Sequence, residues 1–307
     1  MENRHVYDMI IVGGGPGGYT AALYAARAGL DVMVLEKLSA GGQMALTHQI
    51  DNYPGFPEGI DGFELGERMQ QQAEKFGAQS EYAQVLSAEL SAVPKVLHTD
   101  AGDFFSRTVV IATGADPKKL GLEGEDALVG KGVAYCAACD GQFYRGKVVA
   151  VVGGGNSAAA DAAILSRIAK KVYIIHRRDS LRADNASSAP LYKADNVEFI
   201  WNSTVTALLR EEKLTGLKLQ NVHTGEEATL PVDGVFVSIG RSPVTGFLAD
   251  QLELVDGYIP AGEDTATLLS GVFAVGDVRT KELRQIVTAV ADGAQAVHGA
   301  EKYLTSQ

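Results

Sequence analysis

The chain has 307 residues, 46% apolar and 21% charged, which is typical of a folded protein and long enough for about two domains. Its net charge of −11 argues against a nucleic-acid or anionic-membrane partner, since both attract basic surfaces. Its two cysteines are too few for a disulfide-rich secreted fold or for a zinc site with four cysteine ligands.

The charged start of the chain lacks the pattern of a signal peptide, and glycines interrupt the apolar runs before the roughly 18 residues that a spanning helix needs. We therefore expect a cytoplasmic protein. In that compartment a disulfide is more often catalytic than structural.

The first predicted element is an apolar strand, Val6–Val12, that runs into a glycine-rich turn. A helix at Tyr19–Ala28 and a strand at Asp31–Leu35 follow. The turn fits the pattern G-x-G-x-x-G through Gly13, Gly15 and Gly18. Such glycines permit a tight bend, let a pyrophosphate approach the backbone, and let helix and strand pack closely. Glu36 follows the second strand, where an acid can accept hydrogen bonds from a ribose, which suits FAD or NAD.

Two later strands share one ending. Thr108–Ala112 runs into a glycine with a proline three residues further on, and Gly234–Ile239 does the same. The residues of this repeated pattern are Thr113, Gly114 and Pro117 after the first strand and Gly240 and Pro243 after the second. We interpret both as crossovers between domains. The predicted domains are residues 1–116 with 245–307, and residues 117–244 inserted between them.

A C-x-x-C pair, Cys136 and Cys139, lies just before a second nucleotide-binding unit. Such a pair can be half a zinc site, a redox centre or two inert thiols. Zinc would need two more ligands, and the sequence offers no second C-x-x-C and no H-x3–5-H. Asp140 is a candidate proton donor beside the pair, or simply a turn residue of an Asp-Gly step. The redox interpretation is favoured because two nucleotide units would supply electrons.

The second unit repeats the first, with strands at Lys147–Val152 and Lys171–Ile175 and a helix at Ala159–Ala169. Its turn contains Gly153, Gly155 and Ala158. In both units the residue after the second strand lies 23 positions beyond the first glycine. Here it is His176, followed by Arg177, Arg178 and Arg182. Arginines can bind a 2′-phosphate through forked hydrogen bonds, which favours NADPH over NADH, although a solvated basic patch is the alternative.

With these residues in place, the chain closely resembles low-molecular-weight thioredoxin reductases, essentially from end to end. Besides the two glycine turns, the resemblance rests on Gly41-Gly42-Gln43, Asn52-Tyr53-Pro54-Gly55, Cys136-Ala137-Ala138-Cys139-Asp140-Gly141, His176-Arg177-Arg178, Arg182-Ala183, Gly271 to Val278 and Arg284-Gln285. It implies an α/β fold with two Rossmann-like FAD/NAD(P)-binding three-layer domains, the second inserted in the first.

The resemblance also implies the residues that bind each cofactor. For FAD they are Gly13, Gly15, Pro16, Gly18, Glu36, Lys37, Gly41, Gly42, Gln43, Asn52, Val85, Ala112, Thr113, Gly114, Gly276, Asp277, Arg284, Gln285 and Ile286. For NADPH they are Gly153, Gly155, Asn156, Ser157, Ala158, His176, Arg177, Arg178, Arg182, Ile239 and Gly240. Asp277 would bond the ribityl chain, and a helix starting near Gln285 would point its positive end at the flavin. No metal is expected.

The implied reaction passes a hydride from NADPH to FAD, then opens the Cys136–Cys139 disulfide, then reduces thioredoxin. Cys139 would face the flavin, Cys136 would attack thioredoxin, and Asp140 would supply a proton. The resemblance further implies a homodimer, and a domain rotation between the half-reactions with hinges at the two crossovers. Gln142-Phe143-Tyr144 is either an apolar docking edge for the partner or part of the core.

One departure stands out: Ala160 lies where the family commonly has a glutamate, so that only Asp161 keeps an acid there and the contacts to the nicotinamide are in doubt. Rival functions are an NADPH-dependent reductase of another thioredoxin-like protein or of a peroxidase, a ferredoxin- or F420-linked reductase, a small-molecule dithiol oxidase, and a redox-sensing binding protein. The intact second glycine turn and its arginines argue against the rivals that do not use NADPH.

Overall fold

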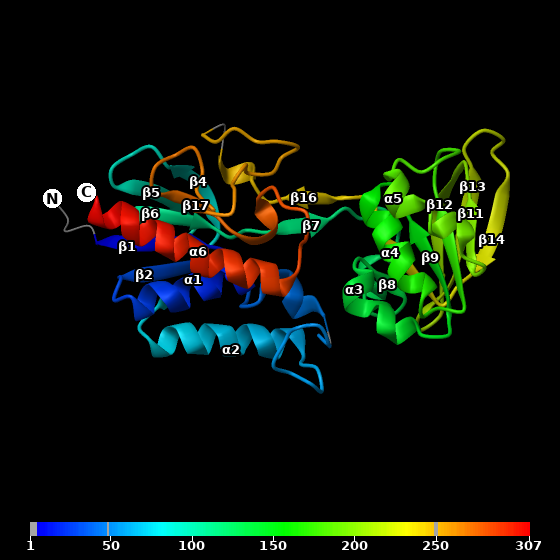
Figure 1. Cartoon of the computed structure of the whole chain (residues 1–307), viewed down its shortest axis with the longest axis horizontal. Helices are drawn as coiled ribbons and strands as arrows, with labels where there is room; N and C mark the ends of the chain where they lie inside the picture. Colours follow the sequence, from blue (N-terminus) through cyan, green and yellow to red (C-terminus); the bar gives the residue numbers. More distant parts are fainter. Residues whose placement is uncertain (1–4, 48, 249–250) are drawn as a thin grey trace. The chain divides into compact units, whose positions relative to one another are not determined.

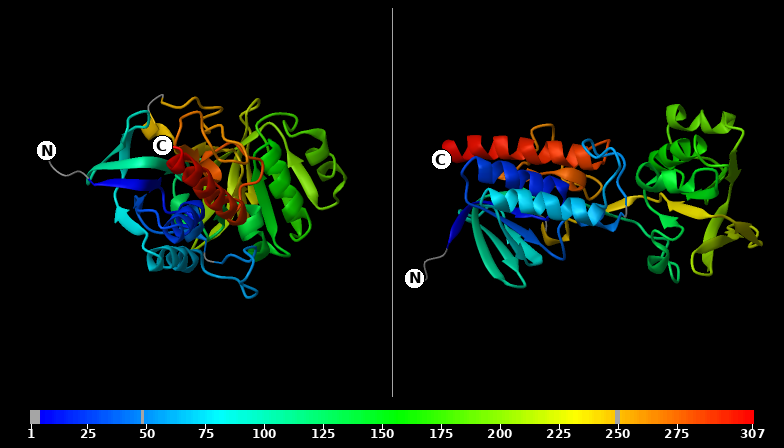
Figure 2. Two further views of the ribbon diagram at one scale, coloured as in Figure 1. Left: turned by 60° about the vertical axis from the view of Figure 1, so that its left-hand side comes forward. Right: turned by 90° about the horizontal axis from the view of Figure 1, so that it is seen from below.

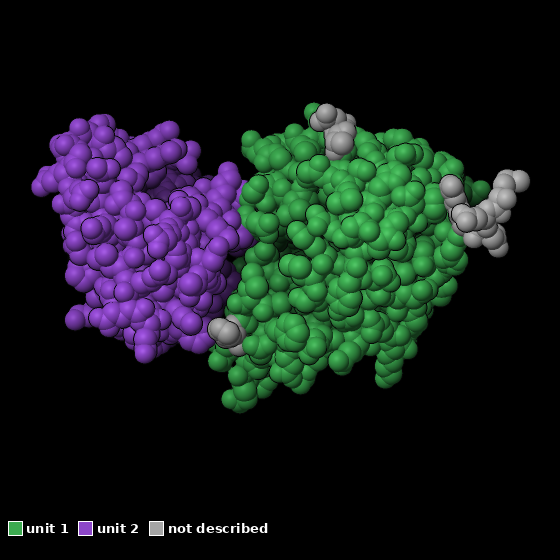
Figure 3. All heavy atoms as spheres, turned by 180° about the vertical axis from the view of Figure 1, so that it is seen from behind, with its two compact units in different colours: residues 1–116, 242–307 green, residues 117–241 purple. Residues whose placement is uncertain are grey.

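The computed structural model describes residues 5–47, 49–248 and 251–307. They form two compact units, which Figure 3 shows in different colours. The first unit consists of residues 1–116 and 242–307, and the second of residues 117–241. The sequence placed its second domain boundary after residue 244, three positions beyond the division that the contacts give.

The first unit is built on a sheet with the strand order β3-β2-β1-β6-β5-β4, and β17 pairs with the C-terminal end of β6. The strands are β1 (Val6–Val12), β2 (Val32–Glu36), β3 (Gln79–Tyr82), β4 (Val85–Glu89), β5 (Lys95–Thr99), β6 (Gly102–Ile111) and β17 (Val272–Ala274). β3, β2, β1, β6 and β17 run parallel to one another, whereas β5 and β4 continue the sheet from β6 as an antiparallel arm.

Helices cover one face of this sheet. They are α1 (Pro16–Arg27), α2 (Gly62–Lys75) and α6 (Ile286–Thr305), which lie in one layer in the right-hand view of Figure 2. Because side chains alternate along a strand, Met9 and Ile11 of β1 pack under the helices, and Ile10 and Val12 pack on the opposite face with β4 and β5. All four side chains are buried. β1 therefore lies between two apolar clusters, one on each face of the sheet.

The second unit has a parallel sheet in the order β11-β10-β9-β15-β8. Its strands are β8 (Val133–Ala134), β9 (Val148–Val152), β10 (Lys171–Ile175), β11 (Val197–Ile200) and β15 (Gly234–Val237). The helices α3 (Ala137–Asp140), α4 (Asn156–Ser166) and α5 (Asn185–Ser188) belong to this unit (Figure 1). An antiparallel sheet of β12 (Ser203–Arg210), β13 (Leu214–Asn221) and β14 (Glu227–Pro231) supplies a second layer.

The alternation of β9 shows how these layers are joined. Val149 and Val151 pack with α3 and α4, whereas Ala150 and Val152 pack with the leucines of β12 and β13. The second unit thus has a helical layer, a parallel sheet and an antiparallel layer. In the first unit the antiparallel arm of β4 and β5 packs on the face opposite the helices. Both helices at the glycine turns begin three residues earlier than the sequence predicted, at Pro16 and Asn156, because the preceding glycine already serves as N-cap.

The chain passes between the units twice, and both passages lie in one small ribbon in which β7 (Ala115–Pro117) pairs with β16 (Arg241–Pro243). The remaining described elements are short 3-10 helices: η1 (Gly42–Leu46), η2 (Asp126–Leu128), η3 (Gly141–Tyr144), η4 (Leu191–Lys193), η5 (Gly246–Leu248) and η6 (Gly276–Val278). Among the described residues, no helix has both the length and the apolar character that crossing a membrane requires.

Candidate functional site

The first glycine turn leaves an open space at the start of α1. Gly13 has φ +106°, and a Cβ there would lie 2.6 Å from the carbonyl oxygen of Ala112. A Cβ on Gly18 would collide with the carbonyl of Gly13, whereas a Cβ on Gly15 would meet nothing within 4 Å. Gly15 is the N-cap of α1 and brings no side-chain cap. Backbone N–H groups at a helix start attract anions, so the turn fits a pyrophosphate.

Glu36 leaves β2 directly beside this turn. Its Oε2 accepts a hydrogen bond from the Gly14 N–H at 2.6 Å, and its Oε1 accepts one from the Leu38 N–H at 3.0 Å. Each carboxylate oxygen has two acceptor sites, so both retain capacity for ribose hydroxyls. Lys37, the next residue in the chain, is exposed.

The segment Gly41-Gly42-Gln43 lies against the same turn. The Gly41 N–H donates to the carbonyl of Gly14 at 2.8 Å, and a Cβ on Gly42 would lie 3.4 Å from the Cα of Gly15. Both glycines have positive φ, which other residues rarely adopt. The structure therefore brings this segment and the turn together, as an FAD site of the first unit requires.

Further predicted FAD residues lie near the end of the chain. Gly276 and Asp277 follow β17, and Arg284 stacks its guanidinium 4.4 Å from the ring centre of Tyr258. Within the described residues, Arg284 Nε is buried without a hydrogen-bond partner. An orphaned donor of this kind fits a missing acceptor such as a flavin oxygen.

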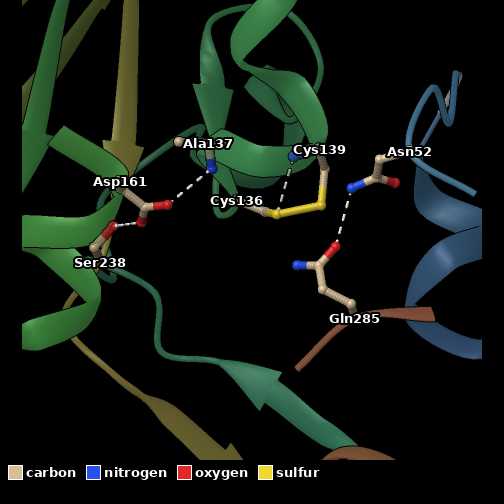
Figure 4. Close-up of a disulfide and its surroundings, with 7 residues drawn as sticks. All are labelled: Asn52, Cys136, Ala137, Cys139, Asp161, Ser238 and Gln285. Atoms are coloured by element: carbon tan, nitrogen blue, oxygen red, sulfur yellow. Dashed lines mark hydrogen bonds between the residues drawn. A yellow bond between two sulfur atoms is a disulfide. The ribbon is translucent and has the colours of Figure 1, made fainter. Parts of the chain in front are cut away.

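The start of α6 lies in the same region. Gln285 is its N-cap and forms a reciprocal capping box with Thr288, and Ile286 is the first helical residue. This agrees with the helix start predicted near Gln285. The Asn52 amide donates to Gln285 Oε1 at 3.0 Å, a pair drawn in Figure 4.

The remaining predicted FAD residues lie at strand ends. Ala112 donates its N–H to the carbonyl of Val12, and Thr113 Oγ1 donates to the carbonyl of Val244. Gly114 has φ +70°, and a Cβ there would meet no atom within 4 Å. Val85 opens β4 and packs on the apolar face opposite the helices.

A buried charge cluster supports this region, and sequence patterns did not reveal it. Asp292 of α6 accepts hydrogen bonds from Arg279, from Lys281 at 2.8 Å and from the Gly276 N–H at 2.8 Å. Burial alone would raise the pKa of Asp292, but the bonds from Arg279 and Lys281 outweigh it and hold the pKa below its usual value. No local motif signals these contacts, because the partners lie on different elements.

The second glycine turn repeats the geometry of the first. A Cβ on Gly153 would collide with the carbonyl of Ser238, and Gly155 is an open, uncapped N-cap of α4. Ala158 is buried against Gly153, where a larger side chain would separate helix and strand. Asn156 Oδ1 accepts the N–H of Asp184 at 2.9 Å. The turn therefore fits a second pyrophosphate.

His176 and the arginines surround this second turn. Two N–H groups of the Arg182–Ala183 segment donate to the carbonyl of Gly154, which holds the arginine loop onto the turn. His176 is buried, and its Nε2 has no partner among the described residues. Burial and then the charges of Arg182, Arg178 and Arg177 lower its pKa. Those arginines are exposed and available to an anion.

The other predicted residues of the second unit lie close by in the chain. Ser157 is exposed in the first turn of α4, and Ile239 is 41% exposed after β15. Gly240 has φ +113°, and its carbonyl accepts the N–H of Lys118 at 3.0 Å. Ser157 thus lies at the start of α4, and Ile239 and Gly240 lie just after the end of β15.

The two cysteines form a disulfide, with their Cα atoms 5.3 Å apart. Cys136 is the N-cap of α3, and its Sγ accepts the N–H of Cys139 at 3.2 Å. Both cysteines and Asp140 are half-buried. The Ala137 N–H donates to the carboxylate of Asp161 on α4 (Figure 4). Among the described residues, no group of three His, Cys, Asp or Glu side chains could hold a metal.

Comparison with known proteins identifies relatives over almost the whole chain. The pyridine nucleotide-disulphide oxidoreductase family matches residues 7–293. A thioredoxin reductase of Listeria monocytogenes is 44% identical over 99% of this chain and 95% of its own length, and one of Bacillus subtilis is 42% identical over 99% and 96%.

Solved structures give the same picture. A thioredoxin reductase from Streptococcus pyogenes matches with a TM-score of 0.89 and 42% identity, covering 98% of this chain and 99% of that one. One from Giardia duodenalis matches with a TM-score of 0.90 and 35% identity, covering 99% and 100%.

Proposed function

Because the chain belongs to the thioredoxin reductases of the pyridine nucleotide-disulphide oxidoreductase family, we propose that it reduces the disulfide of a thioredoxin with electrons from NADPH. It is an oxidoreductase with the two-domain α/β fold predicted from the sequence, and the family uses FAD and NADPH. The observation that carries the proposal is the Cys136–Cys139 disulfide, which lies in the unit that contains the arginine-lined turn.

We propose that the two glycine turns divide the cofactors between the units. Gly15 and Glu36 would hold the pyrophosphate and a ribose of FAD. Gly155 would hold the pyrophosphate of NADPH, and Arg177 and Arg178 would bind its 2′-phosphate. When bound, FAD supplies the chemistry of accepting a hydride from NADPH and passing two electrons to a disulfide.

The cysteines carry the second half of the reaction. Opening the Cys136–Cys139 bond takes two electrons and two protons, and we propose Asp140 as a proton donor beside Cys139. The Cys139 N–H donates to Cys136 Sγ and so stabilises a thiolate there. The Cys136 thiolate then attacks the partner disulfide, and attack of Cys139 on Cys136 releases the partner as a dithiol and restores the original bond.

We propose that the units rotate relative to each other between the half-reactions. The ribbon of β7 and β16 is the only described connection along the chain, with both passages paired in one place. Positive φ at Gly114 and Gly240 flanks it. Hinges are formed by a few residues at the ends of elements, and this ribbon has that character.

The partner surface that we propose is smaller than the sequence suggested. Phe143 is 47% exposed, whereas Tyr144 is buried with its ring 5.1 Å from that of Phe236. Gln142 bonds to Arg145. Phe143 is therefore the apolar group of this segment that is available to thioredoxin, or to another thioredoxin-like protein or peroxidase, the remaining candidates for the partner.

The family also supports a cytoplasmic homodimer as part of the proposal. Light scattering on the purified protein should then give twice the 32.4 kDa of one chain, and cell fractionation should place the protein in the cytoplasm.

The test is a Cys139→Ser variant compared with the wild type. We expect it to keep its yellow FAD and to lose NADPH-dependent reduction of thioredoxin. Cys136→Ser should lose turnover as well, because either serine removes the disulfide. Retained thioredoxin turnover in Cys139→Ser would refute the redox role of the pair.

A further inference from the structure

Asp161 is a buried carboxylate that contacts the redox segment directly. Its Oδ1 accepts the Ala137 N–H at 3.0 Å, and its Oδ2 accepts the hydroxyl of Ser238 in a short hydrogen bond (Figure 4). Ala137 lies between the two cysteines, and Ser238 directly follows β15. One side chain of α4 therefore joins the turn that carries the disulfide to the carboxyl end of the central sheet.

The sequence of α4 places Asp161 on the face that supports the cysteines. Asp161 and Leu165 are one helical turn apart on α4, and Ile168 follows the end of that helix. A Cβ on Gly141 would lie 3.5 Å from Leu165 and 3.3 Å from Ile168. The segment that contains Cys136 and Cys139 thus packs on this side of α4. Ala159 and Ala162 of α4 are buried in the same apolar cluster as Ala137 and Leu165.

A carboxylate in this place requires compensation, because burying a charge is costly unless hydrogen bonds satisfy it. Burial raises the pKa of Asp161, and the bonds from Ser238 and Ala137 and the charge of Arg241 oppose that change. Each of its two oxygens accepts one of these hydrogen bonds, so the carboxylate is tied both to the cysteine turn and to the end of β15.

The bond to Ala137 has a consequence for both cysteines. Cys136 caps α3 with an extended backbone, and its Sγ lies 3.2 Å from the Cys139 N–H. Fixing Ala137, the first helical residue, fixes this cap.

We propose that Asp161 is a positioning residue for the redox pair, which holds the Cys136–Cys139 turn in the geometry of the closed disulfide through Ala137 and Ser238. The proposal rests on the proposed function, since it takes the pair to be redox-active. Two thiols held close together favour the disulfide, so loosening the turn shifts the equilibrium toward the dithiol when two electrons and two protons are added.

The test measures the equilibrium between the protein disulfide and dithiothreitol, with the thiols counted by alkylation. We expect Asp161→Ala to shift this equilibrium at least tenfold toward the dithiol, which is about 30 mV for a two-electron couple. Asp161→Asn keeps an acceptor for the Ala137 N–H and should remain close to the wild type. Ser238→Ala should shift it in the same direction as Asp161→Ala by a smaller factor, and it keeps the test possible if Asp161→Ala does not fold.

Asp233→Ala is the matched control. Asp233 also accepts a backbone N–H, that of Val148 at 2.8 Å, but it is exposed at the other end of the same sheet. Its removal should leave the equilibrium constant unchanged. An unchanged constant in folded Asp161→Ala and Ser238→Ala, or an equal shift in Asp233→Ala, overturns the proposal. If the wild-type disulfide fails to open with NADPH, the proposed function fails instead.

Discussion

One glycine in each turn borders the space in which a phosphate would bind. Gly15 and Gly155 have extended backbones, and an added Cβ would meet no protein atom within 4 Å. Their neighbours Gly13 and Gly153 cannot carry a side chain, because it would strike the adjacent strand. The space beside Gly15 and Gly155 is therefore open to a ligand such as a pyrophosphate.

We predict that Gly15→Ala lowers the affinity for FAD by about tenfold or more, because its methyl group takes the place of the pyrophosphate. Folding should change by about 1 kcal/mol or less, the usual effect of a changed N-cap. Gly155→Ala is the paired variant: it should keep FAD and raise the KM for NADPH. Fluorescence titration with FAD and steady-state kinetics measure the two effects, and a variant that affects both cofactors equally contradicts the division between the turns.

We predict that Arg177→Ala with Arg178→Ala removes the preference for NADPH. Hydrogen bonds to charged groups contribute about 1.5–3 kcal/mol each, so the ratio of kcat/KM for NADPH to that for NADH should fall on the order of 100-fold. Arg210→Ala, an exposed arginine on β12 of the same unit, should leave the ratio unchanged. If NADH is already the better donor for the wild type, the 2′-phosphate assignment is wrong.

At the residue scale the sequence predicted the residues that form local patterns, and it named Asp161 without predicting the contacts of that side chain. The glycines and the arginines occupy fixed positions within a strand-turn-helix-strand repeat, so that spacing was enough to find them. Asp161 lies 24 positions from Ala137 and 77 from Ser238. These contacts depend on how α4 packs in the folded unit, and the spacing of residues in the sequence does not predict that packing.

Among the elements, α6 combines a capped start with a buried charge. Asp292 lies in its second turn, and its side chain and that of Arg279 are each 8% exposed. Removing one partner of a buried ion pair typically costs about 3–5 kcal/mol, because the other charge is left without compensation. Without the carboxylate of Asp292, both Arg279 and Lys281 would be buried charges without a partner of opposite charge.

We predict that Asp292→Asn lowers the free energy of unfolding by about 3 kcal/mol at pH 7. The folded-state pKa of Asp292 is lowered, so its contribution is present above the unfolded value of about 3.9 and is lost as the pH falls through the folded value. The difference between wild type and variant should therefore shrink below about pH 4. Urea unfolding at several pH values measures it.

Asp100→Asn is the control for this prediction, because Asp100 is an exposed acid that accepts the Gln84 N–H at 2.8 Å. It should give a small difference with little dependence on pH. A difference between wild type and Asp292→Asn that stays constant down to about pH 3 would contradict the role of the ionised carboxylate.

The elements that flank the glycine turns were predictable because their apolar runs are short and bounded by glycine. The antiparallel layers, β4 with β5 and β12 to β14, were not identified. Their strands are half-exposed and mix polar with apolar residues, so that no continuous run marks them. Their pairing depends on the parallel sheet that they cover.

For the whole molecule, the division into two units has thermodynamic consequences. Each unit contains its own pair of apolar clusters, one on each face of its parallel sheet. Units with separate cores can unfold separately, and a ligand stabilises only the unit that binds it.

We predict that calorimetry of the FAD-free protein resolves two transitions. FAD at about 100 times its Kd should stabilise one of them by about 2.7 kcal/mol, and NADP⁺ at the same excess should stabilise the other. A single transition that responds equally to both ligands would show that the units unfold as one.

The ribbon of β7 and β16 has a further consequence for how such a chain can be rebuilt. The N–H of Lys118 bonds to the carbonyl of Gly240 within the second unit, and the N–H of Val244 bonds to that of Gly114 within the first, each at 3.0 Å. In each unit, the two chain segments that lead to the other unit therefore lie side by side. A short turn could replace the insert in the first unit, and the second could be excised or circularly permuted at the same place. The second unit is thus an insertion that could be exchanged as a whole. The redox pair and Asp161, the carboxylate that supports it, both belong to that insertion and would be transferred together.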